Sequence, residues 1–244
     1  RILNSYPKAF SLGVTATPLR LDGRGLGLMY DEMIEGPNAR WLTDNGYLAK
    51  IKAFVPPGIN TEGMKHQHGD FAKAALEEAT TPKIVGDAVE HYRRHAEFKP
   101  ALVYCTSVKS AEDAAQAFRD HGYKFVRLDG ESAKDFRAQS LVDLANGTIH
   151  GVCSCDLISE GVDVPRVECG ILLRPTESLG LAWQQIGRTL RPAEGKEYAV
   201  LLDHAGNIRR HGLPTTGREW DLSNGVKKQS VEAKEKTRQC EQCF

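Results

Sequence analysis

Residues 101–128, with the sequence ALVYCTSVKSAEDAAQAFRDHGYKFVRL, decide the fold of this chain. They begin with a short apolar run, residues 101–105, which is typical of a buried strand. Apolar residues at helical spacing follow from Val108 to His121, and Gly122 predicts the end of that helix. The next apolar run is 125–128. A strand, a helix and a second strand in this order predict a βαβ unit with parallel strands.

The same alternation continues to residue 202. We expect helices at about 134–144 and 178–187, and strands at 149–153, 169–173 and 198–202. Strands that alternate with helices of this length predict an α/β lobe with a central parallel sheet flanked by helices.

The first 50 residues look like the end of another such lobe. The apolar run Phe10–Val14 predicts a strand that leads directly into Thr15-Ala16-Thr17-Pro18. After this segment we expect a short helix near 26–33, a linker or crossing strand at 51–55, a polar loop at 59–70 and two helices within 71–97. For the charged last 22 residues we expect a solvated helix or a frayed tail.

Composition excludes several classes of protein. The 244 residues carry 32 Lys and Arg against 32 Asp and Glu, so a globally basic nucleic-acid coat is excluded while a local basic cleft is not. No apolar run approaches the length of a membrane span, and no secretion signal is recognisable. The chain opens at Arg1 rather than Met, which indicates a fragment, a trimmed piece or a processed piece.

Cysteine usage agrees with a reducing, cytoplasmic location, because six cysteines are few for a disulfide scaffold. Four of them lie in or beside apolar runs, where we expect small buried thiols: Cys105, Cys153, Cys155 and Cys169.

Four short segments carry residues suited to chemistry. They are Thr15–Pro18, Val103–Ser107, Ser159–Pro165 and Gln184–Pro192. The first three lie where strands end, and parallel α/β sheets place ligands at the carboxyl ends of their strands.

The fourth segment is the most informative. Arg188 and Arg191 are three residues apart, so they project from one side of a helical turn. Two guanidiniums on one face suit the polyphosphate of a nucleotide, since arginine forms bidentate contacts and keeps its charge. A solvated or salt-bridged helix end is the alternative.

The other candidates also have purely structural alternatives. Thr15 and Thr17 would cap a turn before Pro18, and Asp163 would stabilise a turn before Val164-Pro165. Thr106 and Ser107 would cap the following helix, which is compatible with a functional role.

Taken in order, these segments resemble the motifs of superfamily 2 nucleic-acid helicases of the DEAD/DEAH type. Thr15–Pro18 looks like motif III, Val103–Ser107 like motif IV and 158–165 like motif V. Gln184–Arg191 matches the Q-x-x-G-R-x-x-R of motif VI at every fixed position. Within that superfamily, the chain is similar to bacterial and phage helicases that continue into a Cys-rich tail.

The resemblance implies a motor of two RecA-like lobes that close on ATP. Residues 1–55 would be the remnant of the first lobe and 56–98 a linker with entry helices. Residues 99–222 would be the second lobe with motifs IV to VI, followed by a charged tail at 223–244.

The resemblance also implies a role for each matching residue. Arg188 and Arg191 would be arginine fingers, with Gln184 as a polar partner. Gly161, Asp163 and Gly187 would lie on the nucleotide side. Thr15 and Thr17 would couple hydrolysis to the nucleic-acid face, where Thr106, Ser107 and Cys155 would contact the phosphate backbone, although the Cys155 thiol is a weak donor.

Two motifs of the family are absent from these 244 residues. They contain no G-x-x-x-x-G-K-[ST] loop and no convincing DExH pair, because Asp31-Glu32 follows motif III instead of preceding it. The main ligands of ATP and Mg²⁺ would therefore lie in the first lobe, and the chain alone would be nearly inert. The expected partners are that lobe and DNA or RNA, as a single-stranded track or a duplex junction, with no membrane. The alternatives are a non-catalytic nucleic-acid-binding module and a small nucleotide-binding domain.

Cys240 and Cys243 have the Cys-x-x-Cys spacing of one half of a zinc ribbon. A tetrahedral site needs a second pair, so we expect no tightly held zinc in this chain and zinc only in a longer protein.

Overall fold

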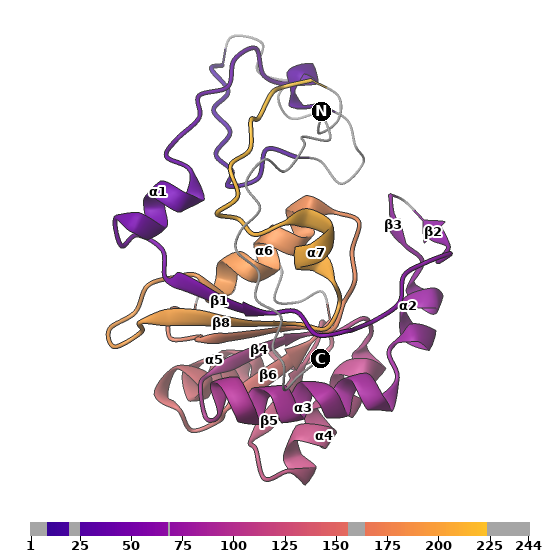
Figure 1. Cartoon of the computed structure of the whole chain (residues 1–244). Helices are drawn as coiled ribbons and strands as arrows, with labels where there is room; N and C mark the ends of the chain where they lie inside the picture. Colours follow the sequence, from indigo (N-terminus) through magenta and orange to yellow (C-terminus); the bar gives the residue numbers. More distant parts are fainter. Residues whose placement is uncertain (1–8, 20–24, 68, 156–163, 224–244) are drawn as a thin grey trace.

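The computed structural model of the chain describes residues 9–19, 25–67, 69–155 and 164–223. Six strands form one sheet in the order β1-β8-β7-β4-β6-β5, and every neighbouring pair is parallel. The strands are β1 (Lys50–Phe54), β4 (Ala101–Tyr104), β5 (Phe125–Leu128), β6 (Gly151–Ser154), β7 (Cys169–Leu172) and β8 (Tyr198–Asp203). Figure 1 shows this sheet between helices. The predicted α/β lobe with a central parallel sheet is confirmed.

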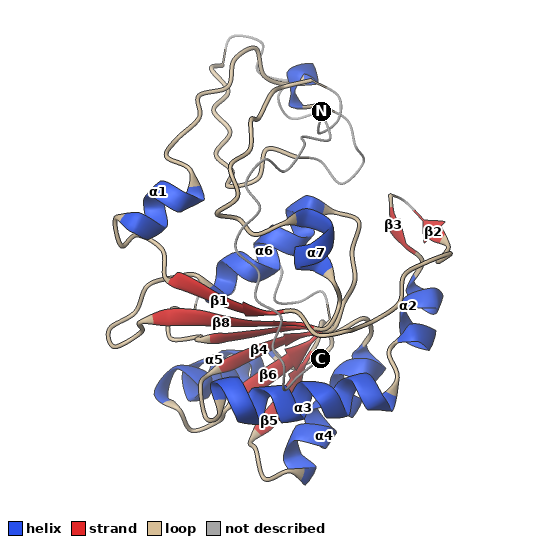
Figure 2. Cartoon of the chain, viewed as in Figure 1, coloured by secondary structure: helices blue, strands red, loops and turns tan. Residues whose placement is uncertain are grey.

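Helices cover both faces of the sheet (Figure 2). On one face, α3 (Pro82–Ala96) and α4 (Val108–Asp120) pack against strand residues such as Val103. On the other face, α5 (Lys134–Asn146) and α6 (Leu179–Thr189) pack against Leu102 and Tyr104. Successive residues of a strand point to opposite faces, and strands buried on both faces need apolar residues throughout. The short uninterrupted apolar runs therefore reflect a three-layer arrangement.

Local chemistry sets the ends of the predicted helices. Thr81 caps α3, and Pro82 occupies its first turn, where a missing N–H costs nothing. The predicted break at residues 80–82 thus separates α3 from α2 (Lys73–Ala79). After α4 the chain turns at Gly122 with φ +85°, a left-handed conformation that glycine adopts without strain.

The edge strand β1 was not assigned to this sheet from sequence. It pairs with β8, with Ala53 opposite Leu201. Residues 50–54 therefore belong to the same sheet as the strands between residues 101 and 203. Other elements that the sequence pattern did not predict are α1 (Ala39–Asp44), α7 (Asn207–His211) and the small antiparallel pair β2 (His66–Gln67) and β3 (Asp70–Phe71).

The prediction of a strand at Phe10–Val14 is wrong. The structure assigns no strand to these residues, and the side chains of Phe10, Leu12 and Val14 are 93%, 80% and 91% exposed. An alternating apolar pattern becomes a strand only beside a hydrogen-bonded neighbour, and none of the described strands pairs with this segment. The helix expected near 26–33 is reduced to one 3₁₀ turn, Leu26–Leu28.

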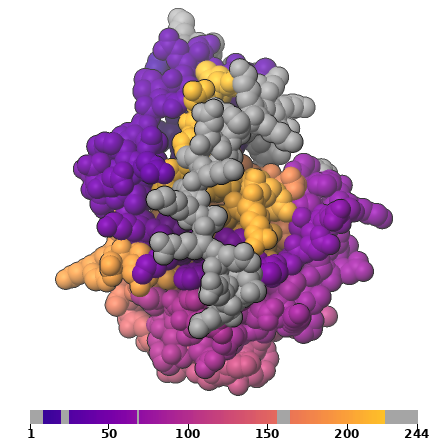
Figure 3. Space-filling model, in the orientation of Figure 1, coloured from indigo at the N-terminus to yellow at the C-terminus, as the bar shows by residue number. Residues whose placement is uncertain are grey.

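The N-terminal segment contacts the last described residues. Gly27 N donates to Leu222 O over 2.9 Å, and Trp220 N donates to Glu35 Oε1 over 3.2 Å. A Cβ at Gly25 would lie 2.4 Å from Leu222 O, so glycine permits this close approach. Figure 3 shows the two segments, in indigo and yellow, at the top of the molecule.

Two findings concern the general character of the chain. Cys105, Cys153 and Cys169 are free and buried as expected, whereas Cys155 is half-buried. Each helix of the described chain lacks either the length or the apolar character that crossing a bilayer requires.

Candidate functional site

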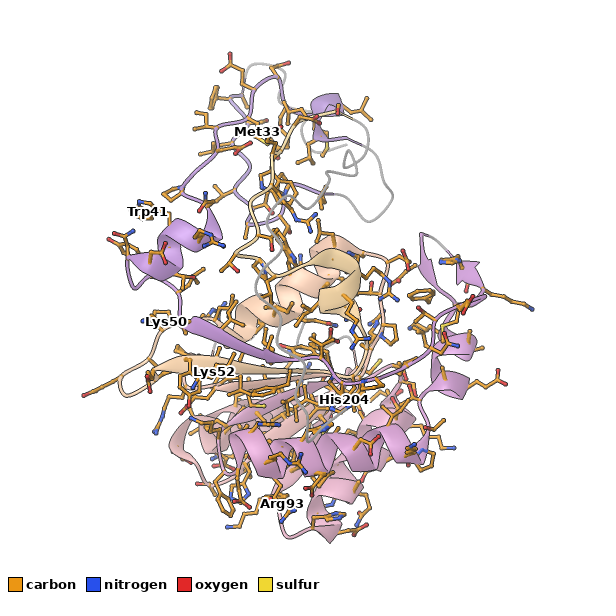
Figure 4. The ribbon with its side chains drawn as sticks, viewed as in Figure 1. Met33, Trp41, Lys50, Lys52, Arg93 and His204 are labelled. Atoms are coloured by element: carbon orange, nitrogen blue, oxygen red, sulfur yellow. The ribbon has the colours of Figure 1, made fainter. Side chains whose placement is uncertain are left out.

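Helix α6 connects the two edges of the sheet. It follows β7 and precedes β8, and since both strands are parallel, it runs from the carboxyl edge back to the amino edge. Its 11 residues span about 16 Å at 1.5 Å per residue. In Figure 4, Lys50 marks the amino edge of the sheet and His204 marks its carboxyl edge. Residues at the two ends of α6 therefore belong to different surfaces.

Arg188 and Arg191 lie at the amino-edge end of α6. Arg188 is in its last turn, Arg191 follows, and both are half-buried. Burial raises the pKa of Tyr104 well above its ordinary value, and the positive charges of both arginines oppose that rise. Both guanidiniums therefore lie near enough to one buried phenol to affect its ionisation.

The other residues of this segment differ in exposure. Gln184 is exposed and Gly187 is half-buried. A Cβ atom at Gly187 would meet no described atom within 4 Å, so the helix is open there, beside Arg188. Gln185 is buried, and its side-chain Oε1 has no hydrogen-bond partner within the described part of the chain.

The two threonines of the Thr15–Pro18 segment bond to each other. Thr15 Oγ1 donates to Thr17 O over 3.0 Å and accepts from Thr17 N over 3.1 Å, which is the turn cap expected as the alternative. A Cβ atom added at Gly180, in the first turn of α6, would lie 3.9 Å from Thr17 Oγ1. Thr17 therefore lies near the opposite end of the helix from Arg188.

Thr106, Ser107 and Cys155 lie together at the carboxyl edge. They follow β4 and β6, which are neighbours with Tyr104 opposite Ser154. Ser107 Oγ accepts from Ser110 N over 3.1 Å, and Ser110 Oγ accepts from Ser107 N over 2.9 Å, forming a capping box. The buried Thr106 hydroxyl is 3.0 Å from Ser110 Oγ. The helix-capping alternative is thus what the structure contains.

Gly161, Asp163, Cys240 and Cys243 lie outside the described residues. Within 9–19, 25–67, 69–155 and 164–223, no three His, Cys, Asp or Glu side chains gather as a metal ion would require.

Sequence reasoning missed two residues near the arginines. The Tyr104 hydroxyl donates to Gln185 O over 2.9 Å and so joins β4 to α6. Lys196 donates from Nζ to Thr189 O and Arg191 O over 2.6 and 2.7 Å. A lysine shortly after a helix end is a known partner for the last carbonyl groups, so its position was the available signal.

Comparisons with known proteins agree with this architecture. The family of the helicase conserved C-terminal domain matches residues 83–193. A 51.5 kDa protein of a Lactococcus phage (isolate 7-9) is 36% identical over 100% of this chain, which spans 54% of that protein. A Saccharomyces cerevisiae protein that bears the name ATP-dependent helicase IRC3 is 24% identical over 80% of this chain, which spans 29% of it. The chain thus spans about half, or less, of these curated relatives.

A solved structure has the same fold. It is a fragment assigned to the HsdR subunit of a type I restriction enzyme from Vibrio vulnificus YJ016, with a TM-score of 0.69 and 24% identity over 87% of this chain and 43% of that chain. The parallel sheet flanked by helices is the RecA-like architecture of a helicase C-terminal lobe. Residues 83–193 therefore carry the conserved C-terminal domain of helicases, and the motifs of the chain follow the order found in superfamily 2.

Proposed function

We propose that this chain supplies the second motor lobe of an ATP-dependent nucleic-acid helicase or translocase. The observation that carries the proposal is the pair Arg188 and Arg191, half-buried together at one end of α6 beside the open side of the helix at Gly187. Such an end suits an anion presented by a facing lobe. The helicase names of relatives such as IRC3 support the same assignment.

In this proposal the two arginines act on ATP held by the first lobe. Negative charge is spread over the oxygens of the transferred γ-phosphoryl group, and guanidiniums placed against it stabilise the transition state. Gln184 would be a polar partner in the same cleft. Gly161, Asp163 and Gly187 would line the nucleotide side, with Mg²⁺ neutralising phosphate charge. A finger without a phosphate cradle cannot position the attacking water, so the chain alone would be nearly inert.

Nucleic acid would bind at the opposite edge of the sheet. Thr106, Ser107 and Cys155 lie there, beside the capped N-terminus of α4, and contacts at this edge would be made to the phosphates of the strand. Thr15 and Thr17 would couple the two surfaces through α6, since Thr17 lies near its first turn. Phosphate contacts imply little base preference, whether the track is DNA or RNA, and whether it is a single strand or a duplex junction.

Two further assignments belong to the same proposal. Cys240 and Cys243 would form half of a zinc ribbon completed by residues of a longer protein. A cytoplasmic location is supported by the free, buried thiols of Cys105, Cys153 and Cys169.

The test uses the intact protein that contains both lobes. Arg188→Ala and Arg191→Ala should each lower kcat for nucleic-acid-stimulated ATP hydrolysis by about 10³-fold or more. Affinity for a fluorescent ATP analogue should change little, because the fingers act in the transition state. Arg93→Ala is the matched control, since Arg93 is an exposed arginine on α3, which packs on the other face of the sheet from α6 (Figure 4).

Unchanged turnover in both finger variants would contradict the proposal. Salt-dependent binding of single strands by the intact protein, without any response to ATP, would favour the alternative of a non-catalytic nucleic-acid-binding module.

A further inference from the structure

Lys196 joins the end of the motif V segment to the end of the motif VI segment. Its Nζ donates to Thr189 O over 2.6 Å and Arg191 O over 2.7 Å, at the end of α6. It also donates to Val167 O over 2.5 Å, and Pro165 O lies 3.4 Å away. Pro165 ends the motif V segment, and Val167 follows it by two residues. One ammonium group therefore bridges two stretches that are far apart in sequence.

This contact satisfies groups that a helix leaves unpaired. The last carbonyl groups of an α-helix have no partner within the helix, and a cation at this end is favoured by the helix dipole. An ammonium group has three protons, which match the three short contacts to Thr189, Arg191 and Val167. The neighbouring Leu190 O accepts from Ala49 N over 2.8 Å. The carbonyl oxygens of three successive residues in the turn that carries Arg191, from Thr189 to Arg191, therefore each accept a hydrogen bond.

We propose that Lys196 is a positioning residue, which fixes the turn of Arg188 and Arg191 at a set distance from the end of motif V. The inference rests on the proposed function of the two arginines. Lys196 itself would touch neither ATP nor nucleic acid. It would act through the backbone of Thr189 and Arg191, to which it is bonded.

The charge of Lys196 makes turnover depend on pH, which a purely structural role of this residue would not do. Burial lowers the pKa of Lys196 to about 8; the carboxylate of Glu168 opposes this shift and the cation of Lys99 adds to it. Glu168 and Lys99 also form an ion pair with each other. Loss of a proton removes one of three donors, so the turn should loosen as pH rises through about 8.

The first experiment measures ATP turnover by the intact protein. Lys196→Met should lower kcat on the order of tenfold to a hundredfold, with the KM for ATP within about twofold, because misplaced catalytic groups cost rate. Lys124→Met is the matched control, since Lys124 is an exposed lysine just before β5, at the same edge of the sheet. An unchanged kcat in folded Lys196→Met would overturn the inference.

The second experiment measures kcat against pH. The wild-type protein should lose turnover as pH rises through about 8, whereas Lys196→Arg, whose charge persists, should retain it. This comparison does not require Lys196→Met to fold. Identical alkaline limbs for wild type and Lys196→Arg would overturn the inference.

The third experiment separates this inference from the proposed function. Amide hydrogen exchange in residues 187–192 should be faster in Lys196→Met than in Lys124→Met. If it is faster while Arg188→Ala and Arg191→Ala leave turnover unchanged, Lys196 holds the turn but the arginines are not fingers. If exchange and kcat are both unchanged in Lys196→Met while the arginine variants are inactive, the fingers are retained and the role of Lys196 is rejected.

Discussion

The hydroxyl oxygen of Tyr104 lies 2.9 Å from the backbone carbonyl oxygen of Gln185, to which it donates a hydrogen bond. The bond joins the carboxyl end of β4 to the middle of α6, across 81 residues of sequence. Arg188 follows Gln185 by one turn of that helix. The contact therefore restrains the rotation of α6 about its axis and, with it, the direction of Arg188.

Removal of this hydroxyl should destabilise the chain measurably. Tyr104→Phe is expected to lower the free energy of unfolding by about 1 kcal/mol, because a buried hydrogen bond is lost while the ring still fills its place. Urea denaturation followed by circular dichroism measures the change. Tyr47→Phe is the control, since Tyr47 is 62% exposed. Equal losses in the two variants would contradict a specific role for the Tyr104 bond.

The aromatic cluster under α4 should contribute more. Phe118 is fully buried, stacks on Phe125 at a centroid distance of 4.0 Å and meets the edge of Tyr92 at 5.5 Å. Phe118→Ala is expected to cost about 3–5 kcal/mol of unfolding free energy, because it leaves a cavity in a packed core. The same denaturation assay measures it, with the 49% exposed Phe136 replaced by alanine as the control. A cost below about 1 kcal/mol would show that the cluster is not packed as described.

The predicted elements that proved correct are those with a local signal. Residues 101–146 alternate apolar strands with helical spacing, and Ser107 and Gly122 mark the ends of α4 through their own backbone chemistry. The strand at Phe10–Val14 had the same kind of local signal and is wrong, because a strand also requires a neighbour. The place of β1 beside β8 depends on pairing across almost 150 residues, which no local pattern encodes.

The residues of the candidate site also divide into those predicted by local spacing and those placed by contacts that form on folding. The spacing of Arg188 and Arg191 predicts that they project from the same side, because residues three apart on a helix lie on one face. Tyr104 and Lys196 were missed because each acts through a contact made only after folding, with Gln185 and with Val167 respectively. Thr106 and Ser107 were placed at the correct edge, although their hydroxyls serve the cap of α4.

Acid should destabilise the chain through His204. The side chain is buried, its Nε2 lies 3.4 Å from His91 Nδ1, and burial lowers the pKa of His204 to about 3. Between about pH 6.5 and 3 the unfolded chain therefore takes up a proton that the folded chain does not, so stability is lost as pH falls through this window.

A variant isolates this effect. His204→Gln should reduce the slope of unfolding free energy against pH in that window by up to one proton, or about 1.4 kcal/mol per pH unit. Urea denaturation at several pH values measures the slope. His121→Gln, an exposed histidine after α4, should leave it unchanged. Equal slopes for wild type and His204→Gln would show that His204 takes up its proton equally in both states.

The last described residues should hold the N-terminal segment against α6. Trp183 of α6 meets the edge of Trp220 at a centroid distance of 5.7 Å, and the guanidinium of Arg218 lies 4.9 Å from the Trp183 ring centroid. From Trp220 the chain continues to Leu222, whose carbonyl accepts from Gly27 N. The contact between Trp183 and Trp220 therefore anchors residues 218–222, the segment to which residues 25–35 are hydrogen-bonded.

Trp220→Ala should release that segment without unfolding the sheet. Amide exchange in residues 25–35 is expected to become faster, because the bonds from Gly27 N to Leu222 O and from Trp220 N to Glu35 lose their anchor. Exchange in β4 and β8 should stay slow, since the core clusters do not include Trp220. Trp41→Ala is the matched control, because Trp41 stacks on Tyr47 rather than on α6. Unchanged exchange at Gly27 in Trp220→Ala would show that the hydrogen bonds hold the two segments together without the tryptophan contact.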